Sequence, residues 1–186
     1  MNTNTKRALA TGLMLLGIGM WSSKAQATNN PDTMTVSVTP NVTYGVSIAS
    51  VSSAGYDFQT VALGATTVST SPVVLTNTGN IAEYFSMAIS SSSGNWGSVI
   101  GTPGTDQFRM VGRFSATQPS STTFNTSDAL DTTAPLSAHS LYGQANTKTI
   151  PTGTQQLWLR LEMPTRLING TTAAQTMTLT VNGQGT

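Results

Sequence analysis

Apolar side chains recur at every second position in several short runs of this chain, and this alternation limits the folds open to it. A strand with one buried face shows a period of two, because its successive side chains point to opposite faces. A helix buries apolar residues three and four positions apart, and no window of about a dozen residues shows that spacing. Alternating runs occur at 34–38, 42–48, 85–89, 108–114, 157–163 and 177–181.

The run at 157–163 illustrates how each strand is expected to sit. Leu157, Leu159 and Leu161 form its apolar face, and Trp158 and Arg160 lie on the opposite face. Turn-forming Gly, Asn and Pro residues separate the runs. About eight to ten short strands with regularly spaced turns and no helix predict an all-β fold, an antiparallel β-sandwich of immunoglobulin-like or jelly-roll type.

Residues 1–27 have the layout of a secretory signal peptide. Lys6 and Arg7 precede an apolar run, and Ala25-Gln26-Ala27 forms a small-x-small cleavage site. Glycines interrupt the apolar run, which is shorter than the roughly 20 residues that span a bilayer, so a membrane anchor is the less favoured alternative. We expect a secreted protein, extracellular or in the cell envelope, whose residues 28–186 form a single domain.

Removal of the signal peptide changes the net charge of the chain. The full sequence has eight Lys and Arg against seven Asp and Glu. Lys6, Arg7 and Lys24 leave with the signal, so five basic residues face seven acidic ones and the net charge is −2. The mature chain has neither the basic surface that binds nucleic acid nor a polybasic run for anionic lipid. We expect no nucleic-acid partner, and no membrane association after cleavage.

The segment 118–149 differs from the rest of the chain because it has few β-branched aliphatic residues. We interpret it as a long surface excursion between strands. Ser127 can act as the N-cap of one short helical turn that follows it. Binding residues often lie on such excursions, but composition alone does not identify any.

A stretch near residue 60 resembles the Hydin-type immunoglobulin-like domains. Tyr56-Asp57-Phe58, a Val-x-x-Gly turn over 61–64 and a strand over 74–80 that ends in Thr-Asn-Thr-Gly-Asn carry the resemblance. It implies a β-sandwich in which Phe58 and Leu75 fill the core and Asn77 and Gly79 form a turn. It implies a structural or protein-binding module rather than an activity. The chain departs from the pattern after Asn80, where an aromatic strand runs into a Ser- and Gly-rich loop.

A second resemblance extends over the whole chain. The signal peptide, the strand "LTNTGN" at 75–80, the low charge and the final strand "GTTAAQTMTLTVNG" at 170–183 are similar to secreted fibre-forming proteins of the camelysin type. This resemblance implies a jelly-roll fold and assembly into fibres at the cell surface.

Few residues are suited to catalysis or metal binding. His139 is the single histidine and there is no cysteine, so the usual zinc ligand sets are excluded. A Ser-His-Asp triad would need Asp128 or Asp131 beside His139, and the chain has no G-x-S-x-G turn to present a serine. Glu162 and Asp106 add no recognisable carboxylate pair. We predict no enzymatic activity, no cofactor and no metal, with a calcium site at Asp128 and Asp131 as a minor alternative.

Three side chains are candidates for contact with a ligand or partner: Trp96, Trp158 and Arg160. Trp96 lies in a Ser- and Gly-rich loop, and Trp158 and Arg160 lie on the polar face of their strand. An exposed tryptophan can stack on a sugar ring, whereas a buried one fills the end or face of a sandwich. Both interpretations stay open on the sequence alone.

Two functions of different classes follow from these observations. The strands have hydroxyl-bearing outer faces and few of the charges that block edge-to-edge pairing, which favours a non-catalytic structural protein of the cell surface or matrix that self-associates into a filament or surface layer. The alternative is a monomeric module that binds a glycan or another envelope protein. The uncharged C-terminal strand at 177–181 either closes its own sheet or completes that of a neighbour.

Overall fold

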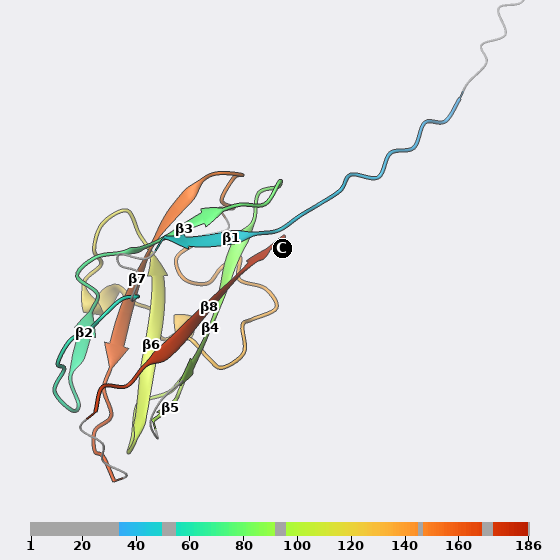
Figure 1. Ribbon diagram of the computed structural model, residues 1–186. Coiled ribbons are helices and arrows are strands. Elements are labelled where there is room, and N and C mark those ends of the chain that lie inside the picture. Colours follow the sequence, from blue (N-terminus) through green and yellow to red (C-terminus); the bar gives the residue numbers. More distant parts are fainter. Residues whose placement is uncertain (1–33, 50–54, 92–95, 145–146, 169–172, 186) are drawn as a thin grey trace, which may run out of the picture. The chain divides into compact units, whose positions relative to one another are not determined.

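The computed structural model describes residues 34–49, 55–91, 96–144, 147–168 and 173–185 (Figure 1). The expected signal peptide lies outside them. The chain divides into two compact units, Met1–Thr39 and Pro40–Thr186. The second unit is all-β, and its described residues form eight strands: β1 (Val46–Ala49), β2 (Thr66–Val68), β3 (Val73–Asn77), β4 (Tyr84–Ser91), β5 (Gly97–Ser98), β6 (Gln107–Phe114), β7 (Thr154–Glu162) and β8 (Met177–Gln184).

The larger sheet is built around β7. Its strand order is β1-β3-β7-β6-β5, and β2 pairs with β7 beyond the end of β3. Most neighbours are antiparallel, but β5 and β6 are parallel, with Gly97 opposite Gln107. The expectation of a purely antiparallel fold is therefore wrong for this pair. The sheet is mixed because the chain returns to run beside β5 in the same direction.

The smaller sheet consists of β4 and β8. All eight residues of each strand pair with the other, from Tyr84 opposite Gln184 to Ser91 opposite Met177. The C-terminal strand therefore completes its own subunit, and the alternative that it completes a neighbour's sheet is wrong. The larger and smaller sheets contribute to one core, whose fully buried side chains include Leu75, Phe85, Met87, Phe108 and Leu157.

The stretch near residue 60 packs against the core through two of its side chains. Leu75 is fully buried, and Phe58 is half-buried against the same core. Asn77 is also fully buried, and its side-chain oxygen accepts a hydrogen bond of 2.7 Å from the Gly79 N–H. The Asn77 amide donates to Thr149 O at 2.7 Å, so the turn after β3 is tied to the segment that precedes β7.

The half-buried strand predicted at 34–38 is not formed. These residues are extended without strand pairing, and Met34, Val36 and Val38 are 84, 78 and 87 % exposed. Alternation favours a strand only where a partner backbone completes the hydrogen bonds, and among the described residues this segment has none. The next predicted run, 42–48, is also shorter than expected, because pairing begins only at Val46.

Between β6 and β7 the described chain has no strand. It contains two single 3-10 turns, η1 (Ser121–Thr123) and η2 (Thr126–Asp128). The helical turn predicted after Ser127 lies slightly earlier, because Asn125 is the N-cap and accepts a hydrogen bond of 3.2 Å from the Ser127 N–H.

Candidate functional site

The sequence candidates Trp158 and Arg160 lie inside the domain. Trp158 is 6 % exposed, packs against Val111 and Phe124, and donates through its indole nitrogen to Ser115 O at 2.9 Å. Arg160 is 7 % exposed and donates to Ser121 O at 2.7 Å. The segment after β6 therefore covers the face of β7 that was expected to be polar and open. Little of either side chain is left to meet a ligand.

An ion-pair cluster accompanies Arg160 on this face. Glu162 Oε1 accepts from Arg160 at 2.6 Å, and Glu162 Oε2 accepts from Arg109 at 2.6 Å. All three side chains are mostly buried, so the cluster joins β6, β7 and η1. Trp96, the third candidate, is half-buried against the main core. The structure therefore does not bring Trp96, Trp158 and Arg160 together.

The titratable residues His139 and Asp128 of the 118–149 segment differ in exposure. His139 is exposed, and its Nδ1 shares a hydrogen bond of 2.6 Å with the Ser137 hydroxyl. Asp128 is buried, and its carboxylate accepts from the Tyr142 N–H at 2.9 Å. Burial raises the pKa of Asp128, against the opposing effects of that N–H and of Arg113. In the described part of the chain no three acidic or histidine side chains gather in a group that could hold a metal ion.

A shallow hollow opens on the surface of this segment. Its lining combines hydroxyl groups of Thr126, Ser127 and Thr133 with the apolar side chains of Ile100 and Leu136. Leu136 is 97 % exposed and Ile100 is 59 % exposed. The lining of the hollow therefore offers both hydroxyl groups and exposed apolar side chains.

Groups from the segment before β7 occupy one edge of the small sheet. Alternate residues from Glu83 to Ile89 turn their backbone groups away from β8 and meet this segment. Glu83 exchanges two backbone hydrogen bonds with Thr149, and the Ile89 N–H donates to Asp131 O at 2.9 Å. The Phe85 N–H donates to the side-chain oxygen of Gln144 at 2.8 Å.

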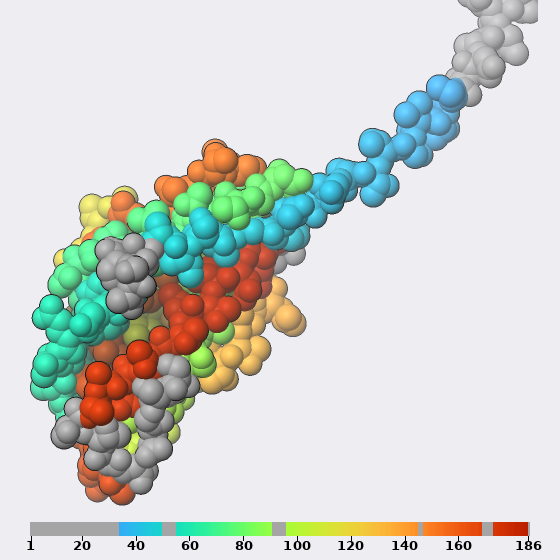
Figure 2. Space-filling model, in the orientation of Figure 1, coloured from blue at the N-terminus to red at the C-terminus, as the bar shows by residue number. Residues whose placement is uncertain are grey.

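Among the described residues, no strand pairs with the opposite edge of the small sheet, on β8. In an antiparallel pair the N–H and C=O of a residue point to the same side, and successive residues alternate. Since Glu83, Phe85 and Ile89 point away from β8, their register partners on β8 point away from β4. In the described part of the chain no backbone hydrogen bond reaches the outward groups of Leu179 and Val181. Figure 2 shows β8 as a red band at the surface.

Two of the three apolar core-facing side chains of β8 are only partly covered, whereas Val181 is buried. Met177 and Leu179 are half-buried, whereas Met87 and Ile89 on the same face of β4 are buried. Phe58 and Met163 are also half-buried against the core. The apolar face of the small sheet is thus buried on β4 and at Val181, and partly covered at Met177 and Leu179.

Glu83 is the buried charge nearest to this edge. It is fully buried, its Oε2 accepts from the Gly45 N–H at 3.1 Å, and its Oε1 has no partner among the described residues. The carboxylate lies against Gly183 of β8, where a Cβ atom would collide with it. Burial raises the pKa of Glu83, and the Gly45 N–H opposes that shift. Glu83 therefore joins the start of β1 to both strands of the small sheet.

Sequence reasoning missed both Glu83 and Gln144. A signal for Glu83 was present, because it is the single charged residue between Asp57 and Asp106 and directly precedes an apolar alternating run. No comparable signal marks Gln144, which lies in a polar segment and contacts a strand 59 positions away.

Comparisons with known proteins add no further assignment. No family model matches the chain, and neither a curated protein nor a solved structure matches it. Within the described residues, no helix has the length and apolar character needed to cross a membrane.

Proposed function

We propose that the chain is a non-catalytic structural protein, exported to the cell surface or extracellular matrix, that self-associates by strand addition at the open edge of β8. The all-β unit is then a β-sandwich of immunoglobulin-like or jelly-roll type. The observation that carries the proposal concerns β8, an eight-residue strand that has one edge without a partner strand among the described residues. Its apolar face is only partly covered at Met177 and Leu179.

The shortness of the other strands that could accept a partner favours β8 as the site of addition. Among the described strands, β1, β2 and β5 have four, three and two residues, and short strands offer few groups to an added one. The described residues of 173–185 carry no charge, so the usual electrostatic block to edge pairing is absent from β8.

The segment Met34–Thr39 of a second copy is the strand that we propose is added. Its three apolar side chains are among the most exposed of the described residues, and they alternate with Thr35 and Ser37. β8 has the same division, with apolar residues facing the core and Thr178 and Thr180 exposed. An added segment with its apolar side inward would cover the half-buried Met177 and Leu179. Its hydroxyl groups would then lie beside those of Thr178 and Thr180 on the outside.

Matched lysine variants of this segment test the proposal. Val36→Lys places a charge on the side that would face the core and should abolish assembly, while Ser37→Lys places it on the solvent side and should leave assembly largely intact. Both positions precede the folded unit, so its thermal stability should not change. Light scattering after size-exclusion chromatography and negative-stain images provide the measurement. Equal assembly by the two variants would contradict the proposal.

Cysteine cross-linking identifies the copy that supplies the strand. The chain contains no cysteine, so Val36→Cys and Leu179→Cys proteins each carry a single thiol. Mixing the two variants under mild oxidation should give a disulfide-linked heterodimer if the strand comes from another copy. A protein that carries both substitutions and forms only an internal disulfide would show that the segment binds its own subunit instead.

The hollow beside Leu136 supports the alternative function, a monomeric module for a glycan or envelope protein. Its hydroxyl and apolar lining suits a sugar. A mature protein that remains monomeric at high concentration and binds on a glycan array would favour this function. Loss of that binding in Leu136→Asp would locate the site.

A further inference from the structure

We propose that Asp131, Tyr142, Gln144 and Thr149 act as a guard that closes the β4 edge to strand addition, so that each copy accepts one strand, at β8. The consequence for assembly rests on the proposed function. The guard itself can be measured in the monomer.

The guard occupies the β4 edge at every second residue. Glu83 donates to Thr149 O at 3.0 Å and accepts from its N–H at 2.8 Å. Further along, Ile89 donates to Asp131 O at 2.9 Å. Between them, Phe85 bonds to Gln144 and the Met87 backbone bonds to the Tyr142 hydroxyl. An incoming strand would need these same backbone groups.

Gln144 replaces a strand residue with its side chain. Its amide oxygen accepts from the Phe85 N–H at 2.8 Å, and its amide nitrogen donates to Phe85 O at 3.0 Å. The same nitrogen donates to Ala138 O at 2.9 Å, which fixes the amide in place. Gln144 is 3 % exposed, so these bonds are largely protected from water.

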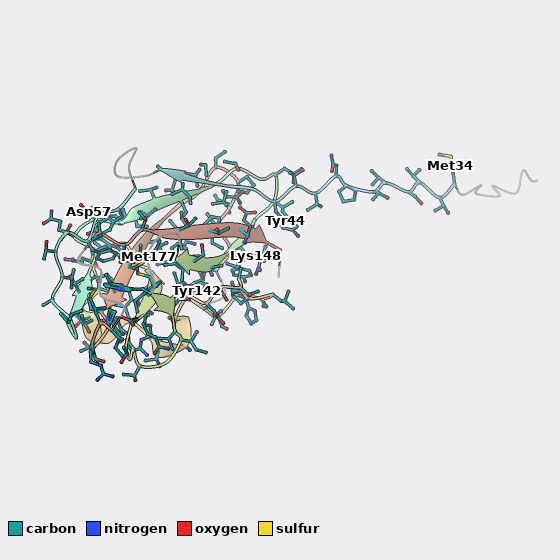
Figure 3. The ribbon with its side chains drawn as sticks, turned by 60° about the horizontal axis from the view of Figure 1, so that its bottom comes forward. Met34, Tyr44, Asp57, Tyr142, Lys148 and Met177 are labelled. Carbon is teal, nitrogen blue, oxygen red and sulfur yellow. The ribbon has the colours of Figure 1, made fainter. Side chains whose placement is uncertain are left out.

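Tyr142 is placed by an unusual backbone. Its φ is +57°, in the left-handed region, and Gly143 follows with a φ of +75°. The Asp128 carboxylate and the Phe114 N–H bond to the backbone of Tyr142 at 2.9 and 2.6 Å. These contacts hold Tyr142, labelled in Figure 3, with its side chain 2 % exposed. Burial raises the pKa of Tyr142 to about 12, which keeps its hydroxyl neutral.

A guard made of side chains and irregular backbone can terminate a sheet, whereas an added strand only moves the edge outward. A further strand on β4 would satisfy the same groups but would present a new row of N–H and C=O groups on its far side. Gln144 and Tyr142 satisfy β4 without creating such a row. The small sheet is left with a single accepting edge, and copies joined through it would form unbranched, polar chains.

Removal of the Gln144 amide tests the guard. In Gln144→Ala we expect the Phe85 amide hydrogen to exchange with solvent at least tenfold faster, with β7 amides unchanged. The matched control is Gln118→Ala, which also lies in the segment between β6 and β7. It removes the hydrogen bond of 2.8 Å that the Gln118 side-chain amide donates to Ser69 O, away from β4. If Gln144→Ala does not fold, Tyr142→Phe removes only the hydroxyl bond to Met87 and should accelerate exchange there.

Strand binding provides the second measurement. Val36→Lys protein, which should not assemble, is mixed with a synthetic peptide of residues 28–39 and examined by native mass spectrometry. We expect one bound peptide with the guard intact and two in Gln144→Ala. One peptide in both proteins would overturn the guard. If neither protein binds the peptide, the proposed function fails. The guard is then tested by the oligomeric state of Gln144→Ala alone. Self-association of this variant would support the guard, and a monomeric variant would overturn it.

Discussion

At the scale of single residues, Glu83 is the group whose ionisation should most directly affect stability. Its buried carboxyl accepts from the Gly45 N–H and lies against Gly183, while its backbone pairs with Thr149. The neighbouring Lys148 lies over the Tyr84 ring. Because burial raises the pKa of Glu83, the folded state holds the proton more tightly than the unfolded state. This contribution to stability is complete below the unfolded pKa and is lost as pH rises through the folded one.

Replacement of Glu83 by Gln tests that dependence. Glutamine keeps the shape and can still accept from the Gly45 N–H, but it does not ionise. We expect the melting temperature of Glu83→Gln to exceed that of the wild type by an amount that grows as pH rises from acid to neutral. Thermal unfolding followed by circular dichroism across that range measures it. A constant difference between the two proteins would show that the pKa of Glu83 is the same in the folded and unfolded states.

At the scale of elements, β7 is buried on both faces, and this changes the expected cost of substitutions along it. Leu159→Ala should destabilise by about 2–5 kcal/mol because it leaves a cavity in the core. The sequence analysis placed Arg160 on the polar face of its strand, where replacement by Ala would cost much less. Since Arg160 bonds to Ser121 O and Glu162 while 7 % exposed, we now expect its loss to cost about 1.5–3 kcal/mol.

Urea denaturation of the two variants measures these costs. Arg113→Ala is a suitable control, because Arg113 lies on the same face of the sheet but is only half-buried. It should cost less than Arg160→Ala. Equal stability of Arg160→Ala and the wild type would mean that the cluster around Glu162 contributes nothing to the fold.

Alternation predicted strands well where both partners lie in the domain. Phe85, Met87 and Ile89 were expected on one face of a strand, and all three are buried on β4. The same alternation at Met34–Val38 predicted a strand that is not formed, because a side-chain pattern does not reveal whether a neighbouring backbone is available. The order of the strands and the mixed sheet were not predictable, since they depend on pairings between distant residues.

The guard and the buried face of β7 could not be predicted for a related reason. Both depend on where the segment between β6 and β7 lies, and its composition of Ser, Thr and Asn indicates only a surface position. Asp128, for example, belongs to a polar stretch and yet is buried beneath Tyr142. Long-range backbone contacts, rather than local preferences, decide the position of such residues.

At the scale of the whole molecule, the low charge should make assembly nearly independent of ionic strength. Only 8 % of residues are charged, against roughly a quarter in an average domain. Because neither Met34–Thr39 nor β8 carries a charge, screening has little to act on. We expect the extent of assembly to change less than about twofold between roughly 50 and 500 mM NaCl. Light scattering measures it, and a steep loss with salt would indicate a charge-driven contact instead.

The pairing of β4 with β8 also bears on the order in which the chain folds. Tyr84 pairs with Gln184, one hundred positions later, so β4 is made long before its partner. Contacts between such distant residues are slow to form, on a scale of roughly milliseconds to seconds. During that interval Asp131, Tyr142, Gln144 and Thr149, which precede β8, can already shield one side of β4. Until β8 is synthesised and pairs, a newly made chain would then expose unpaired backbone groups on one edge of β4 rather than on both.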